Sequence, residues 1–132
     1  MRTQPCDAVI RRGRLRKAEQ FGEAAAMVRD LADEDADVAD AYVTLCVHAG
    51  IAASDVICCA RLGKHAQGEK HNEAVDLLKT ADKEVAKHLS TLLNLKTKSG
   101  YSHTSATVDE FRRAGRAAEA LVEAARRAHA ST

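Results

Sequence analysis

The sequence predicts an all-α protein, an antiparallel up-and-down four-helix bundle, and three observations lead to that fold class. Alanine is abundant and proline occurs once, a composition that favours helices over strands. Apolar residues recur at helical spacing along four stretches, which are separated by polar or glycine-containing segments. No stretch shows strand-like alternation, and short connections favour antiparallel packing of helices that follow each other along the chain.

The size and composition of the chain predict one globular domain spanning residues 1–132. A chain of 132 residues with 45% hydrophobic and 30% charged residues is long enough, and apolar enough, to bury a single core. It contains two Phe, two Tyr and no Trp, so Ala, Val, Leu and Ile must fill that core. Small alanine side chains let helices approach closely, which suits a bundle.

The first helix is expected over about 7–31, with Asp7 at its N-terminus, where a carboxylate is favoured. Gly13 and Gly22 weaken this helix, so a broken first helix is an alternative. The second helix is expected over about 36–62 and is ended by Gly63. It is the most apolar of the four, which indicates a central position.

The third helix starts near Asn72, fades over 94–100, and carries an apolar stripe at helical spacing: Val75, Leu78, Ala81, Val85, Leu89, Leu92 and Leu95. The fourth helix has a clear start, because Thr107 and Glu110 have the spacing of a capping box. These two helices complete the predicted bundle.

Charge is unevenly distributed along a chain whose net charge is only +1. Residues 1–18 carry six Lys or Arg and one Asp, whereas residues 19–40 carry eight acids and one Arg. The basic segment is suited to an acidic partner or a nucleic acid. The alternative is that the acidic stretch neutralises it within the fold.

The four cysteines show neither a C-x-x-C motif nor the paired spacing of a metal site. We expect Cys6, Cys46, Cys58 and Cys59 to be buried, reduced thiols, which implies a cytoplasmic protein. The N-terminus lacks the apolar core of a signal peptide, and no run is expected to span a membrane.

Asp55 is the least expected residue of the second helix, because a carboxylate in apolar surroundings is costly unless it is paired. His48 lies two turns earlier on nearly the same face. One hypothesis is a buried acid that orients a cation or an imidazole from another segment, and the alternative is an acid at the surface. His65 and His71 are predicted to lie in or beside a solvated loop; no ligand set is evident, so no metal or cofactor is expected.

The segment 96–103 concentrates two cations, a phenol and an imidazole between the third and fourth helices. Lys98 and His103 have four residues between them, as do Lys96 and Tyr101. A His can move the 2′-hydroxyl proton of RNA while a Lys stabilises the phosphorane charge, without any metal. Lys98 and His103 are therefore candidate catalytic residues, although a polar inter-helix loop without function has the same composition.

Three pieces of sequence resemble the HEPN superfamily, the higher eukaryotes and prokaryotes nucleotide-binding domains. The stretch 49–63 is similar to its Ala-rich helix with an internal Asp, and Gly68 to Ala74 is similar to the Gly-His-x-x-Ala opening of its next helix. The stretch 92–101, followed by the helix from Thr107, resembles its segment in which Arg precedes a small or acidic residue and Tyr. Together these pieces cover about residues 40–127.

The resemblance implies a helical bundle, frequently a homodimer, that binds a nucleotide or RNA or works beside a nucleotidyltransferase in a toxin–antitoxin or defence system. Nuclease members carry Arg followed after four to six residues by His. Here Lys96 falls at the Arg position and Tyr101 at the His position, and the shifted pair would be Lys98 and His103. Because that signature is altered, binding is expected rather than cleavage.

We therefore expect a cytoplasmic, dimeric HEPN-like binding module. Its predicted ligand-binding residues gather near one groove: Asp55, Lys96, Lys98, Tyr101 and His103. The alternatives are a metal-independent ribonuclease that uses Lys98 and His103, and a purely structural dimerisation domain.

Overall fold

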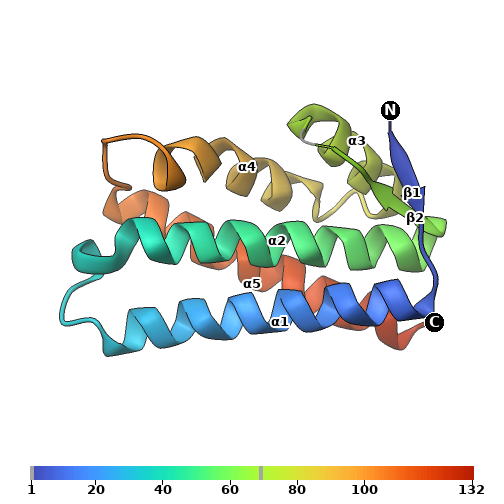
Figure 1. Ribbon diagram of the computed structural model, residues 1–132, viewed down its shortest axis with the longest axis horizontal. Helices are drawn as coiled ribbons and strands as arrows, with labels where there is room; N and C mark the ends of the chain where they lie inside the picture. Colours follow the sequence, from blue (N-terminus) through green and yellow to red (C-terminus); the bar gives the residue numbers. More distant parts are fainter. Residues whose placement is uncertain (1, 69) are drawn as a thin grey trace.

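The computed structural model describes residues 2–68 and 70–132, which are all-α apart from one small sheet (Figure 1). Helix α2 (Ala39–Leu62) is central and packs against α1 (Ala8–Leu31), α4 (Ala86–Gly100) and α5 (Val108–Ala130). The remaining elements are shorter: β1 (Thr3–Pro5), the 3-10 helix η1 (Asp35–Val38), β2 (Lys64–Ala66) and α3 (His71–Ala81). The all-α prediction is confirmed, whereas the two short strands were not predicted.

Local signals in the sequence set three of the helix ends. The Asp7 side chain accepts a hydrogen bond from the Ile10 amide at 3.0 Å and so caps α1. Thr107 and Glu110 form the full capping box at the start of α5. Gly63 ends α2 with φ 72°, a left-handed conformation that glycine adopts without steric cost.

A broken first helix was an alternative, and it is wrong: α1 is continuous through Gly13 and Gly22. Packing of its apolar face offsets the roughly 1 kcal/mol that each glycine costs a helix. The break falls instead in the expected third helix, between α3 and α4. There Asp82 leaves the helical conformation and its side chain accepts a hydrogen bond from the Glu84 amide at 3.1 Å, in local competition with the helix.

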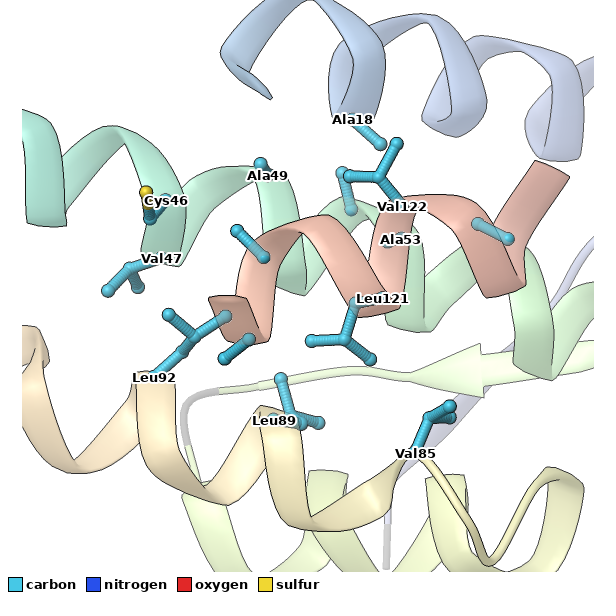
Figure 2. Packing of buried hydrophobic residues seen from close by; sticks show 14 of the residues in the cluster. Ala18, Cys46, Val47, Ala49, Ala53, Val85, Leu89, Leu92, Leu121 and Val122 are labelled. Carbon is cyan, nitrogen blue, oxygen red and sulfur yellow. The ribbon is translucent and has the colours of Figure 1, made fainter. Parts of the chain in front are cut away.

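The core lies between α2, α4 and α5 and is built mainly from alanine and leucine (Figure 2). Ala49 and Ala53 of α2 are completely buried, and Leu89 and Leu92 of α4 point toward Leu121 of α5. The small side chains of α2 let its neighbours approach, as the composition predicted.

Gly50 is a position on α2 where side chains of α4 and α5 pack close to the backbone. A Cβ atom at this position would collide with Cδ1 of Leu92, a fully buried residue. The absence of a side chain at Gly50 therefore fixes the distance between α2 and α4, and α4 carries both Lys96 and Lys98.

The two strands form an antiparallel pair in which Thr3 faces Ala66 and Pro5 faces Lys64. This pairing brings Cys6 to the last turn of α2, where it forms a disulfide with Cys59 across a Cα–Cα distance of 5.8 Å. The prediction of four reduced thiols is thus wrong for these two cysteines, because a pairing between positions 53 apart leaves no local spacing motif. Cys46 and Cys58 are free and buried, as expected.

The stretch Asp35–Leu62 is long and apolar enough to cross a membrane, judged by its length and by a mean hydropathy of 1.8 over an 18-residue window within it. In the structure 67% of its most apolar window is buried inside the protein, which is the environment of a core helix.

Candidate functional site

A groove of about 340 Å³ opens between α2, the segment that follows β2, and helices α3 and α4. This volume lies in the range of small-molecule sites. Its lining combines apolar and polar side chains: Ile51, Ala66, Gly68, Ala74, Leu89 and Leu93 with His48, Ser54, Asp55, Lys70, His71 and Lys96. An apolar floor with a few polar groups is the usual composition of a site that binds a small organic ligand.

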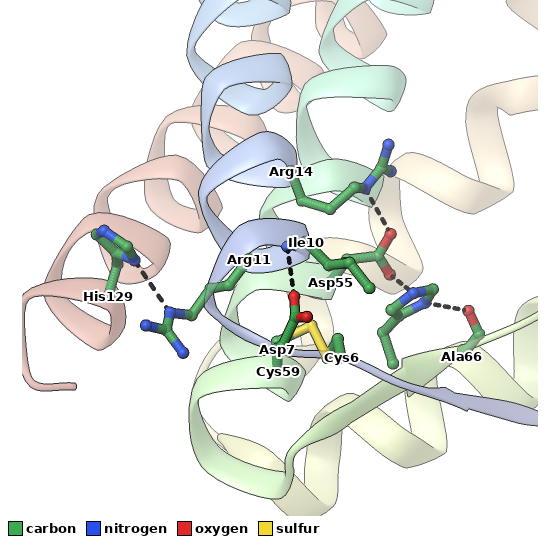
Figure 3. Close-up of a disulfide and its surroundings, with 10 residues drawn as sticks. Cys6, Asp7, Ile10, Arg11, Arg14, Asp55, Cys59, Ala66 and His129 are labelled. Carbon is green, nitrogen blue, oxygen red and sulfur yellow. Dashed lines mark hydrogen bonds and ion pairs between the residues drawn. A yellow bond between two sulfur atoms is a disulfide. The ribbon is translucent and has the colours of Figure 1, made fainter.

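Asp55 is the most constrained polar residue of this groove (Figure 3). Its carboxylate accepts a hydrogen bond from Nε of Arg14 on α1 at 2.9 Å, and Nδ1 of His65 lies 3.8 Å from its other oxygen. Burial raises the pKa of Asp55, while the nearby guanidinium and imidazole oppose that rise. The hypothesis was a buried acid that orients a cation or an imidazole from another segment, and Arg14 of α1 is such a cation.

His65 joins the strand β2 to the helix α2. Its Nδ1 lies 2.8 Å from the carbonyl oxygen of Ala66, and because a carbonyl only accepts, this nitrogen carries the proton. The His65 side chain is only 14% exposed, so the prediction of a solvated loop is wrong at this position. The cause is the position of the imidazole between the Ala66 carbonyl, which its Nδ1 contacts, and the Asp55 carboxylate of α2.

Positive charge reaches the groove from two elements. Lys96 comes from α4 and Lys70 from the start of α3, whose positive dipole end adds to it, and the imidazole of His71 lies beside Lys70 in the sequence. On α2, His48 lies against the ring of Phe21, with a centroid distance of 5.3 Å. Since Arg14 balances the charge of Asp55, the described lining offers an anion two lysines and two imidazoles.

The predicted site residues separate into two groups. Asp55 and Lys96 line the same groove. Lys98 donates a hydrogen bond to Glu110 of α5 at 2.7 Å, Tyr101 is 80% exposed, and His103 is exposed beyond the end of α4. None of these three lines the groove, among residues 2–68 and 70–132.

Helix α4 explains this separation, because it continues to Gly100 and so includes most of the segment that was expected to be a loop. Residues two positions apart on a helix do not face each other. Lys96 therefore faces α2 and α3, while Lys98 faces α5.

Glu110 joins the end of α4, which carries Lys98, to the start of α5. It accepts hydrogen bonds from Lys98 and, at 2.9 Å, from the Thr107 amide, and these bonds lower the pKa of its carboxyl. Lys98 is thus engaged in a structural contact between α4 and α5.

A second hollow of about 280 Å³ lies between α1 and α5, with Tyr42 and Cys46 among its lining residues. Burial raises the pKa of Tyr42 to about 12 and that of Cys46 to about 11, so both are neutral near pH 7. The Arg126–Glu19 ion pair joins its two walls at 3.1 Å. This hollow offers no ionised nucleophile, and we do not assign it a function.

Arg14 and Lys70 were not predicted as site residues, and His65 was placed in a solvated loop, whereas His71 was expected to help start the third helix and does begin α3. These residues lie far from Asp55 and Lys96 in the sequence, so no spacing motif links them. The one usable signal was Asp55 itself, since a carboxylate in an apolar helix requires a partner. Arg14 supplies it from the basic N-terminal segment, which thus pairs with α2 here.

No model of a known protein family matches this chain, and no curated protein matches it either. The likeness to the HEPN superfamily therefore stays a prediction from the residues that carry it.

Proposed function

We propose that this protein is a HEPN-like four-helix binding module that holds a nucleotide or an RNA end in the groove beside Asp55, without cleaving it. The observation that carries the proposal is that Lys70, Lys96, His48 and His71 line one groove of about 340 Å³ together with apolar side chains. Such a site matches a ligand that is anionic at one end and flat and apolar at the other.

Each part of the groove has a role in this proposal. Lys96 and Lys70 attract a phosphate from two sides, and His71 donates a hydrogen bond to it. Ile51 and Leu93 provide apolar surface for a base or a sugar. Asp55 positions the rim, since it holds His65 and with it the end of β2.

Binding without cleavage is favoured by the state of Lys98. A lysine that stabilises a phosphorane must present its charge to the substrate, whereas Lys98 is bonded to Glu110 at 2.7 Å. His103 is exposed and does not line the groove. A ribonuclease that uses these two residues would have to break the Lys98–Glu110 contact first.

The binding proposal is tested by titrating the protein with adenosine monophosphate, inorganic phosphate and a short single-stranded RNA. We expect Lys70→Gln combined with Lys96→Gln to weaken the binding of the nucleotide at least about tenfold, because two charge-assisted contacts are lost. The matched control combines Lys79→Gln and Lys87→Gln, which make the same charge change on exposed faces of α3 and α4. Equal losses in both double variants would show non-specific attraction and contradict the proposal.

The salt dependence of affinity separates the two ligand classes. An RNA that replaces counterions along its backbone loses affinity steeply as salt rises, whereas a mononucleotide loses little. Incubation of labelled RNA with EDTA tests the ribonuclease alternative. Cleavage by the wild type that disappears in His103→Ala would replace binding by catalysis.

We also propose a homodimer and a nucleotidyltransferase as partner, on the basis of the HEPN resemblance. Apolar side chains are exposed where α1 and α4 end and α5 begins, at one end of the molecule: Met27, Leu31, Tyr101 and Val108 (Figure 1). They offer contact area to a second copy. Sedimentation velocity of the pure protein tests the homodimer. The wild type should sediment as a dimer, and a Leu31→Ser, Tyr101→Ser variant should be monomeric. A dimer that binds none of the three ligands would favour a purely structural domain.

A further inference from the structure

We infer that the Cys6–Cys59 disulfide is a redox switch that controls the ligand groove. Oxidation fixes strand β1 against β2 at the rim of the groove, and reduction lets β1 detach. The inference rests on the proposed binding function and adds its regulation. Three structural links connect the disulfide to the groove, and the chemistry of the two sulfur atoms suits a reversible bond.

The first link is the strand pair that the disulfide closes (Figure 3). Cys6 follows β1 directly, and its amide donates a hydrogen bond to the carbonyl of Gly63 at 3.0 Å. On the far side of the pair, the Gln67 amide donates to the carbonyl of Arg2 at 2.9 Å. Strand β1 is thus held against β2 over its full length, by the strand pairing and by one hydrogen bond beyond each end of it.

The second link runs from β2 into the groove. Ala66 is the last residue of β2 and Gly68 follows two positions later, and both line the groove. The third link is His65, whose imidazole contacts Asp55 of the groove wall. If β2 becomes less well ordered, three parts of the site are therefore affected: Ala66, Gly68 and, through His65, Asp55.

The strand pair depends on the disulfide because each strand has only three residues. A two-stranded ribbon of this length is not stable alone in water, and an N-terminal segment frays unless it is held. When the disulfide is broken, we expect β1 to detach, and the rim of the groove loses the strand that orders it.

The two cysteine residues differ in exposure. Cys59 is only 4% exposed, whereas Cys6 is half-buried, so we expect solvent to reach Cys6 first. The neighbouring thiol of Cys58 is buried, and burial raises its pKa to about 12, so it does not compete as a thiolate. The exchange is therefore confined to one pair.

The reaction is thiol–disulfide exchange with a low-molecular-weight disulfide as the oxidant. The Cys6 thiolate attacks that disulfide, forms a mixed disulfide and releases one small thiolate. The Cys59 thiolate then attacks the sulfur of Cys6 and releases the second, so one protein disulfide and two small thiols result. An excess of the same small thiol reverses both steps and regenerates its disulfide, which makes the bond a sensor of oxidation.

The test measures the affinity for adenosine monophosphate of the oxidised and the reduced full-length protein. We expect reduction to weaken binding about tenfold, since the ligand must then order the rim itself. Cys6→Ser should bind as weakly as the reduced wild type and should not respond to oxidant. Cys46→Ser, which removes a buried thiol outside the disulfide, should keep the full response.

Hydrogen exchange supplies a second readout that needs no ligand. The amides of Cys6 and Gln67 should exchange faster in the reduced protein, while amides in the middle of α2 should not change. Measurable binding that is equal in both redox forms would overturn the inference and leave the proposed function intact. If neither form binds the nucleotide, phosphate or RNA, the proposed function fails, and control of a ligand site is overturned with it.

Discussion

Two carboxylates, Asp55 in the groove wall and Glu110 at the junction of α4 and α5, have pKa values that folding shifts in opposite directions. Asp55 lies in the groove wall, where burial raises its pKa against the opposing effect of Arg14. Glu110 lies at the junction of α4 and α5, where hydrogen bonds from Lys98 and Thr107 lower its pKa. The ionised form of Asp55 is thus disfavoured by folding, whereas that of Glu110 is favoured. A buried carboxylate with a perturbed pKa in a groove is a candidate for a functional site, which is why the groove beside Asp55 is proposed as the site.

Both regions depend on the position of α4, so the largest expected effect comes from moving that helix. Gly50→Ala should lower the free energy of unfolding by about 1–3 kcal/mol, because the new methyl group collides with Leu92. Gly13→Ala is the matched control, since no heavy atom lies within 4 Å of its added Cβ. It should stabilise α1 by about 0.5–1 kcal/mol. Urea unfolding measures both, and the same sign in both variants would contradict the close approach of α2 and α4.

The second largest expected effect on the free energy of unfolding distinguishes Glu110 from Asp109, an exposed carboxylate next to it in the sequence. Glu110→Gln should lower the free energy of unfolding by about 1 kcal/mol, because the oxygen that accepts from Lys98 and from the Thr107 amide stays but its charge is lost. Asp109→Asn removes the neighbouring carboxylate, whose pair with Arg113 is exposed, and should cost only about 0.3–0.5 kcal/mol. If the two variants lose equal stability, Glu110 has no special role at this junction.

Asp55→Asn should behave differently at neutral pH. Asparagine keeps an oxygen that accepts from Arg14 and removes a charge that burial disfavours. Because the raised pKa means that folding favours the neutral carboxyl over the ionised one, we expect the free energy of unfolding to stay within about 0.5 kcal/mol of the wild type, or to rise slightly. A loss comparable with that of Glu110→Gln would mean that the Arg14 pair outweighs desolvation.

The pH dependence of unfolding sharpens the same contrast through its sign. The folded pKa of Glu110 is lowered, so its stabilisation is present above its unfolded pKa of about 4.3 and is lost as pH falls through the folded value. The folded pKa of Asp55 is raised, so its favourable contribution is present below its unfolded pKa of about 3.9 and is lost as pH rises through the folded value. Glu110→Gln should flatten the acid loss of stability, and Asp55→Asn should steepen it.

Local chemistry explains how much of the fold was predictable. The Asp7 cap, the Gly63 end and the Thr107 capping box all depend on residues within four positions of one another, and all are confirmed. The break at Asp82 escaped prediction because the apolar stripe keeps its helical spacing across it. A periodicity does not register a side chain that bonds its own backbone.

The candidate site was predictable only in part, for a geometric reason. Asp55 was predicted as a site residue because it is a charge in an apolar helix, and Lys96 was predicted as part of a polar segment. Lys98 was grouped with Lys96 because the two are close in sequence, yet on a helix they face different neighbours. The disulfide between Cys6 and Cys59 depends on a strand pair of three residues, which is too short to leave a pattern.

The most direct test of which of the two regions binds a ligand is a titration with adenosine monophosphate of two variants on one helix. Lys96→Gln and Lys98→Gln make the same charge change two positions apart on α4. We expect Lys96→Gln to lose at least about tenfold in affinity and Lys98→Gln to stay within about twofold of the wild type. The reverse result, with affinity lost in Lys98→Gln and kept in Lys96→Gln, would contradict the assignment of the groove beside Asp55 as the site.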